Sequence, residues 1–207
     1  MGAAMTDEEP NYILSFDPGK SSGVALIQYD EESVWPQGAW QPEGGVAGLV
    51  KWYAANTEDS PFRSGWALAP TQDGLLELSY FLDDAPTIIS EKFTPLSGGG
   101  FNQTLDSVEP LRGEGALIAL GLMPDYPDPK WRRPDRQYLY GGANLAEKKR
   151  RAHRFLKDSG FYVTGKDVGC KDANDARSAM LHGLSYLAQV VKHKPTYDLI
   201  SNWTEKN

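Results

Sequence analysis

The segment YILSFDPGKSSGVALIQY, residues 12–29, decides the fold that the sequence predicts. Residues 12–17 and 23–29 are two short apolar runs, and a turn rich in Pro, Gly and Ser lies between them. Short apolar runs bounded by turn formers are typical of buried strands. The sequence therefore predicts a β-hairpin whose first strand ends at a carboxylate, Asp17.

Strand and helix patterns alternate through the rest of the chain. Further strands are predicted at residues 33–40, 87–92, 136–140 and 161–165, and helices at residues 109–122, 144–158 and 172–191. Pro36 favours an edge position for its strand, and Asn144 is a good helix N-cap. Residues 42–84 allow no firm assignment, although residues 46–55 and 74–82 have helical apolar spacing. This order predicts an α/β domain with a mixed central β-sheet flanked by helices.

The length of 207 residues suits one domain. We expect a flexible N-terminus at residues 1–10, one domain at 11–195 and a C-terminal tail at 196–207. No run of about 18 apolar residues predicts a membrane span, and the acidic start is unlike a signal peptide. A single cysteine, Cys170, cannot form an internal disulfide, which fits a cytoplasmic location.

Four acids stand at the ends of predicted elements. Asp17 ends the first strand, Glu91 nearly ends a later one, and Asp172 and Asp175 open the last helix on one side of its first turn. Each has an ordinary explanation alone: a turn former, an ion pair, or a helix cap and a dipole partner. Together they favour a shared cation, since Mg²⁺ takes oxygen ligands and two ions about 3.5–4 Å apart promote phosphodiester hydrolysis. His182 lies ten residues beyond Asp172, so we interpret it as a packing or surface histidine.

Charge is distributed unevenly along the chain. The net charge is −7, yet residues 130–154 hold nine bases against two acids, whereas residues 1–60 hold ten acids against two bases. A phosphate-binding surface needs local positive charge, although a solvated helix face is the alternative. Expected contacts to the DNA backbone are Arg132, Arg133, Lys148, Lys149, Arg150 and Arg151. Lys20 is a further candidate as a point charge; its GKS triplet is no P-loop, because Leu14 stands where that motif needs a glycine.

Three motifs resemble those of RuvC-like Holliday junction resolvases, a branch of the RNase H-like nucleases. FDPGKSSGVALI resembles their first motif, IISEKF the second and KDANDARSAMLHGL the last. The resemblance covers about residues 12–190 and places Asp17, Glu91, Asp172 and Asp175 on the four metal-binding acids. It implies an RNase H-like fold, Mg²⁺ or Mn²⁺, two metal ions, a homodimer and cleavage of branched DNA in recombination and repair.

The resemblance has further implications and two departures. It assigns Phe101 to unstacked bases, because such enzymes carry an aromatic soon after the second acid. The turn after Asp17 is shorter than in bacterial members and is similar to that of phage-type members, for which the compartment would be the host cytoplasm. Residues 36–73 look inserted. These departures bear on junction specificity more than on the metal site.

Alternatives remain open at this point. An RNase H-like nuclease acting on forks, flaps or RNA–DNA hybrids would use the same chemistry on another substrate. A non-catalytic DNA-binding protein of the same fold would not need all four acids. An actin-like ATP-binding fold needs a second Gly-rich phosphate loop, and the glycines at 98–100 follow the wrong kind of element.

Overall fold

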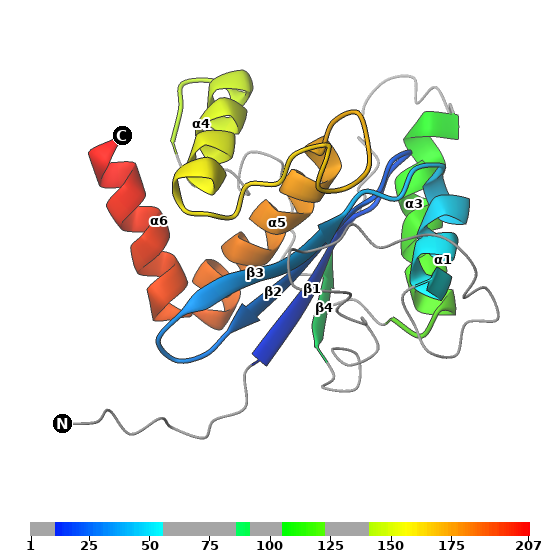
Figure 1. The fold of residues 1–207 in the computed structure, drawn as a ribbon, viewed down its shortest axis with the longest axis horizontal. Helices are drawn as coiled ribbons and strands as arrows, with labels where there is room; N and C mark the ends of the chain where they lie inside the picture. Colours follow the sequence, from blue (N-terminus) through cyan, green and yellow to red (C-terminus); the bar gives the residue numbers. More distant parts are fainter. Residues whose placement is uncertain (1–10, 56–85, 92–104, 123–140) are drawn as a thin grey trace, which may run out of the picture.

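A computed structural model describes residues 11–55, 86–91, 105–122 and 141–207. Within these ranges the protein is mixed α/β, with a four-stranded sheet between two layers of helices (Figure 1). The strands predicted at 136–140 and the helical spacing at 74–82 lie outside the described residues, as does the expected flexible N-terminus at 1–10.

The sheet has the order β3-β2-β1-β4. β1 (Asn11–Asp17) and β2 (Gly23–Tyr29) form the predicted antiparallel hairpin, and β3 (Val34–Trp40) continues it antiparallel to β2. β4 (Thr87–Ser90) pairs parallel to β1, so the sheet is mixed as predicted. β3 lies at an edge, where its Pro36 removes no ladder hydrogen bond from a central strand.

Side chains of β1 alternate between two apolar cores. Leu14 and Phe16 pack on one face with α1 (Gly45–Ala55) and α3 (Leu105–Ala119). Ile13 packs on the other face. That second face carries α4 (Leu145–Asp158), α5 (Asn174–Tyr186) and α6 (Lys194–Lys206), as Figure 1 shows. Because strand residues alternate in direction, Ser15 and Asp17 belong to the same face as α5.

Close backbone contact fixes α5 against the sheet. Ser15 donates a hydrogen bond from its hydroxyl to the carbonyl of Ala179, at 2.8 Å. A Cβ at Gly23 would overlap the backbone of Asp175, and one at Gly183 would meet the side chain of Ile27. Glycine therefore lets the first turn of α5 lie directly on the start of β2.

The helix α4 follows the prediction closely. Its N-cap is Asn144, whose side chain accepts a hydrogen bond from the backbone N–H of Glu147 at 2.9 Å. The carboxylate of Glu147 accepts in return from Ala143 N–H, so two of the free N–H groups at the helix start are satisfied. Gly160, with φ of +83°, follows the C-terminal end.

Three predicted elements differ from the structure. Residues 161–164 form no strand. The last long helix begins at Asn174 and continues as a π-helical turn, η1 (Leu187–Val191). The expected tail at 196–207 is instead helix α6, because Thr196, Ile200 and Trp203 give it an apolar face that is buried against the core. The described part of the suspected insertion, residues 36–55, also belongs to the core, through Leu49 and Trp52.

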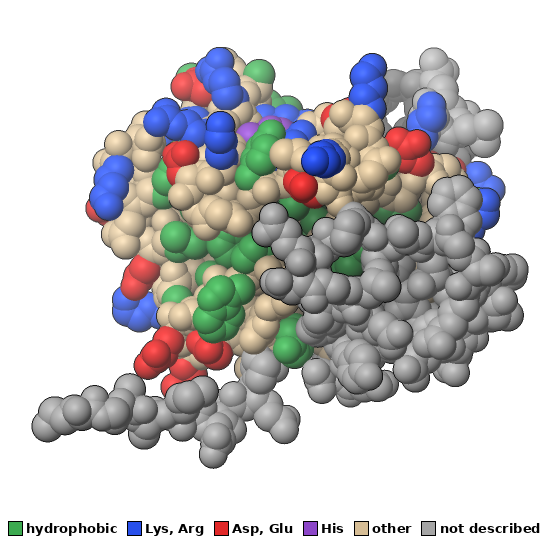
Figure 2. All heavy atoms as spheres, viewed as in Figure 1, with side chains coloured by type: hydrophobic (Ala, Val, Ile, Leu, Met, Phe, Trp, Pro, Cys, Tyr) green, Lys and Arg blue, Asp and Glu red, His purple; other side chains and the backbone are tan. Residues whose placement is uncertain are grey.

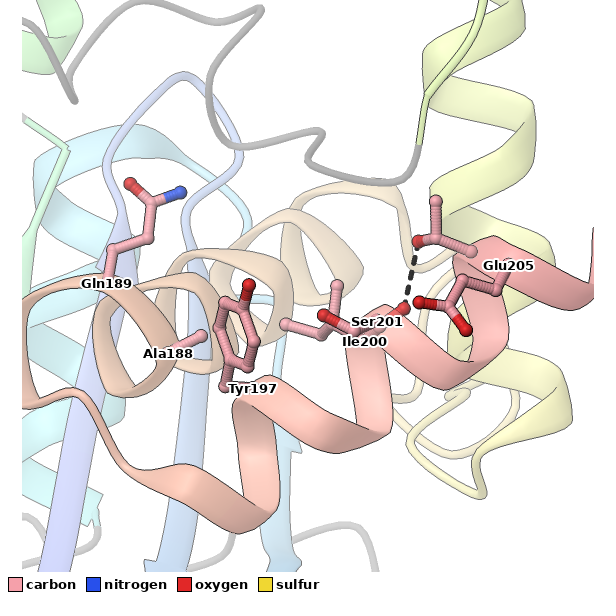
Figure 3. Close-up of a pocket in the computed structure, with 7 residues that line it drawn as sticks. Ala188, Gln189, Tyr197, Ile200, Ser201 and Glu205 are labelled. Atoms are coloured by element: carbon pink, nitrogen blue, oxygen red, sulfur yellow. Dashed lines mark hydrogen bonds between the residues drawn. The ribbon is translucent and has the colours of Figure 1, made fainter.

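A surface pocket of about 330 Å³ lies between η1 and α6 (Figure 3). Tyr197 and Ile200 of α6 face Ala188 and Gln189 of η1 across it. It shares no residue with the acids that the sequence singles out.

Candidate metal centre

The register between β1 and β4 brings two of the acids side by side. Phe16 pairs with Ser90, and the backbone N–H of Glu91 donates to the carbonyl of Phe16 at 3.2 Å. Asp17 and Glu91 are the next residues on the two parallel strands. Parallel strands end at the same edge of a sheet, so both carboxylates stand at that edge on the face covered by α5.

The third member of the site is His182, from the middle of α5. Its Nε2 lies 3.5 Å from a carboxylate oxygen of Glu91. One ligand atom each from Asp17, Glu91 and His182 lie within 4.8 Å of one another. The imidazole is buried, with 4% of its surface exposed. The expectation that His182 stands away from the carboxylates is therefore wrong.

The sequence did contain a signal for this histidine. Asp175, Ser178 and His182 are spaced by three and four residues, which places them on one face of a helix. The Ser178 hydroxyl reaches Asp17. Asp172 does not belong to this spacing, because it precedes the helix.

The two carboxylates of the cluster have opposite pKa shifts. Burial raises the pKa of Asp17 to about 7, and the charges of Glu91 and Asp175 add to the rise, while His182 and Ser178 oppose it. Burial also pushes up the pKa of Glu91, but the hydrogen bond and charge of His182 outweigh it and hold that pKa below its usual value.

The pKa shifts of Asp17 and His182 both favour their protonated forms. The pKa of His182 is raised, because the hydrogen bond and charge of Glu91 together with the charge of Asp17 outweigh the effect of burial. A carboxyl that retains a proton and an imidazole that gains one both reduce the negative charge of the cluster. A bound metal ion would displace these protons, since metal ligands must be deprotonated.

Asp175 borders the cluster without joining it. It lies in the first turn of α5, partly buried, and its charge acts on Asp17. Burial raises its pKa, and the charge of Asp172 adds to this, while the Ser21 hydroxyl and Lys149 oppose it. Among the described residues, its carboxylate is outside the set whose ligand atoms lie within 4.8 Å.

Asp172 does not approach the cluster. Its side chain is fully exposed and accepts a hydrogen bond from the backbone N–H of Asn174 at 3.1 Å. That hydrogen bond lowers its pKa. The prediction that Asp172 opens the last helix on the same side as Asp175 is wrong. The helix begins two residues later, at Asn174, and Asp172 lies in the segment before it.

The start of α5 is capped by Gln41, a residue that was not predicted from the sequence. Gln41, just after β3, accepts hydrogen bonds at its side-chain oxygen from the backbone N–H groups of Asp175 (3.0 Å) and Ala176 (3.2 Å). Its side-chain nitrogen donates to the carbonyl of Asp172 at 3.1 Å. Ala173, the N-cap position, supplies no side-chain hydrogen bond. Gln41 therefore caps the helix from another part of the chain, 134 residues from Asp175.

The predicted basic surface lies on α4. Figure 2 shows Lys and Arg side chains gathered over this helix. Lys149 and Arg150 are exposed, and Lys148 is partly buried. Arg151 is already engaged by α6: it donates to the carbonyl of Asn207 at 3.0 Å and lies over the ring of Trp203.

Lys149 connects this surface to the acids. Its charge acts on Asp175 and also on His153, whose pKa is lowered to about 4 by burial, Arg177 and Lys149. Lys20 is exposed just after β1. The expected DNA contacts at Phe101, Arg132 and Arg133 lie outside the described residues.

Comparison with models of known protein families, with curated proteins and with solved structures found no match. In the part of the chain that the structure describes, no helix is long and apolar enough to cross a membrane.

Proposed function

We propose that this protein is a divalent-metal-dependent endonuclease of the RNase H-like, RuvC-like type that cuts branched DNA. The observation that carries the proposal is the convergence of Asp17, Glu91 and buried His182 at one edge of the sheet. The sequence motifs add support, because two of the acids that the resemblance implies as metal ligands, 74 positions apart in the chain, lie close together.

The donor set fits a divalent ion. Ligands of an octahedral ion with bonds of about 2.1 Å are about 3 Å apart when adjacent and about 4.2 Å when opposite. The ligand atoms of the cluster, within 4.8 Å of one another, reach that spacing with small side-chain rotations. Two neighbouring carboxylates, one of which has its pKa raised by burial and by the charge of the other, are the electrostatic complement of such an ion.

Each residue then has a definite task. Asp17 and Glu91 hold the ion at the strand ends, and Asp175 supplies a further carboxylate on the α5 side, where a second ion would need one. A bound divalent ion supplies a water nucleophile at neutral pH and stabilises the charge of the leaving oxygen. Gln41 keeps Asp175 in place through the backbone of α5.

The basic residues of α4 favour a polyanionic substrate. Lys148, Lys149 and Arg150 provide positive charge beside an acidic site that would otherwise repel phosphate. Contacts of this kind position a duplex without reading its sequence. Branched DNA and a homodimeric enzyme are the substrate and assembly that the motif resemblance supports.

The test is cleavage of end-labelled four-way junctions, forks, flaps, RNA–DNA hybrids and linear duplexes, with Mg²⁺, Mn²⁺ or EDTA. We expect metal-dependent cutting of branched DNA. The change Asp17→Asn should reduce the rate about 1000-fold, since metal stabilisation is worth several kcal/mol and about 1.4 kcal/mol corresponds to tenfold.

The matched control is Asp158→Asn at the end of α4, which should cut normally, because Asp158 is outside the cluster and the asparagine oxygen can still accept the hydrogen bond from the Trp203 indole. Paired symmetric nicks in the junction would identify a resolvase, whereas cutting only of forks, flaps or hybrids would change the substrate. DNA binding without cleavage by the wild-type protein under every condition would contradict the nuclease proposal and leave a binding protein.

A further inference from the structure

The metal site differs from an all-oxygen site in one ligand. His182 is fixed in the middle of α5, where Gly183 and Ala179 pack directly on the sheet. Its buried ring faces Glu91, with Nε2 at 3.5 Å from the carboxylate. An imidazole in this place is within reach of an ion held by Asp17 and Glu91.

We propose that His182 is a direct ligand and that the site formed by Asp17, Glu91 and His182 therefore selects a divalent transition-metal ion, represented by Mn²⁺, over Mg²⁺. This inference rests on the proposed function, because it concerns the ion of that same site. Imidazole nitrogen suits first-row transition ions, whereas Mg²⁺ is bound almost entirely by oxygen and gives up its waters reluctantly.

The geometry supports a ligand role. The ligand atoms of the three side chains are mutually within 4.8 Å, so one ion can touch all three. The Nε2 of His182 and a carboxylate oxygen of Glu91 are 3.5 Å apart, which is close to the spacing of about 3 Å expected for adjacent ligands of one ion.

The remaining carboxylate gives the site two unequal halves. Asp175 stands outside the three-residue group, on the side of Lys149 and the first turn of α5. The imidazole nitrogen belongs to the three-residue group, which is therefore the part of the site that discriminates between Mn²⁺ and Mg²⁺.

The experiment measures metal binding to the full-length, metal-free protein without nucleic acid. Equilibrium dialysis and calorimetry with Mn²⁺ or Mg²⁺ alone should give Mn²⁺ at least about tenfold tighter binding. Pulsed EPR of the Mn²⁺-loaded protein should show coupling to a ¹⁴N nucleus. In His182→Asn, whose shorter side chain brings no imidazole nitrogen to the position of Nε2, the ¹⁴N coupling should vanish and the preference should fall to about threefold or less.

Controls separate this inference from the proposed function. His153→Asn changes a histidine of α4 outside the cluster and should preserve both the preference and the ¹⁴N coupling. Wild-type protein that binds Mn²⁺ without ¹⁴N coupling overturns the ligand role even if His182→Asn fails to fold. An unchanged preference in folded His182→Asn also overturns it. Because no DNA is present, a nuclease that fails to cut can still pass this test, and an active nuclease can fail it.

Discussion

Asp17 and Glu91, at the ends of two strands, lie together in the cluster, whereas Asp175 only borders it and Asp172 is exposed. The sequence predicted the same role for all four. Asp17 and Glu91 meet because the β1–β4 register leaves them no other neighbour position. Asp172 and Asp175 depend on where α5 begins and how it is rotated. The helix begins at Asn174, so Asp175 faces the site from its border and Asp172 faces solvent.

This difference shows what each kind of element can guarantee. A strand turns a side chain to one of two faces, so the alternation along β1 is sufficient to orient Asp17. A helix turns by about 100° per residue, so its rotation about its own axis decides which side chains face the sheet. A residue before its first turn, such as Asp172, does not follow this spacing. Packing then has to fix the rotation of the helix about its axis. Here the close approach of α5 to Gly23 and the hydrogen bonds from its first turn to Gln41 do so.

The largest effect should come from separating α5 from the sheet that carries Asp17. The change Gly23→Ala places a Cβ within the backbone of Asp175, and overpacking against a backbone that cannot yield should cost about 3 kcal/mol. Urea denaturation and metal binding would both be measured. We expect loss of stability together with weakened Mn²⁺ binding, because α5 also carries His182.

The control for this change is Gly115→Ala, in α3, where a Cβ meets nothing within 4 Å. It should be neutral or stabilise by up to about 1 kcal/mol. Equal behaviour of the two variants would contradict the close approach of α5 to β2.

A second effect should distinguish the two helix-borne acids. Asp175→Asn removes a carboxylate beside the site and should slow cleavage about 10–100-fold, the usual effect of a supporting residue at a metal. Asp172→Asn, at an exposed position, should change the rate less than twofold. Single-turnover rates at saturating metal would show this difference, and equal losses would restore the four-acid site of the sequence analysis.

A smaller effect should follow from uncapping α5. Gln41→Ala removes three hydrogen bonds to the start of the helix and should cost about 1 kcal/mol, or about 2–4 °C in Tm. Gln41→Glu keeps the accepting oxygen and should recover most of the stability. A helix that melts unchanged without the Gln41 side chain would argue against capping by that residue.

The last effect concerns pH without metal. The pKa of Asp17 is raised from 3.8 to about 7 and that of His182 is raised above 6.5, so the stability that their protonated forms contribute is present below the ordinary values and is lost as pH rises through the raised ones. The lowered pKa of Glu91 acts in the opposite direction, but only at and below its ordinary value of 4.5, so it does not offset the decline between pH 5 and 8. Melting in EDTA between pH 5 and 8 should show a decline in wild type and a weaker one in Asp17→Asn; a steeper decline in the variant would contradict the assignment.

The sequence was informative where local patterns determine structure. The hairpin, the edge strand at Pro36 and the capped helix α4 were all predicted, because each depends on neighbouring residues. The helix α6 was missed, since its buried face repeats only at Thr196, Ile200 and Trp203. Gln41 could not be found, because nothing in its own surroundings indicates a helix start more than a hundred residues away.

The order of the site residues along the chain determines when the site can form during synthesis. The hairpin that carries Asp17 is complete by residue 29, yet its partner His182 arrives only after about seven-eighths of the 207 residues have been made. Domains assemble as synthesis proceeds, so a nascent chain passes through most of its production with the two halves of the site still apart. We therefore expect the three side chains of the proposed metal site to be available together only when the chain is nearly complete.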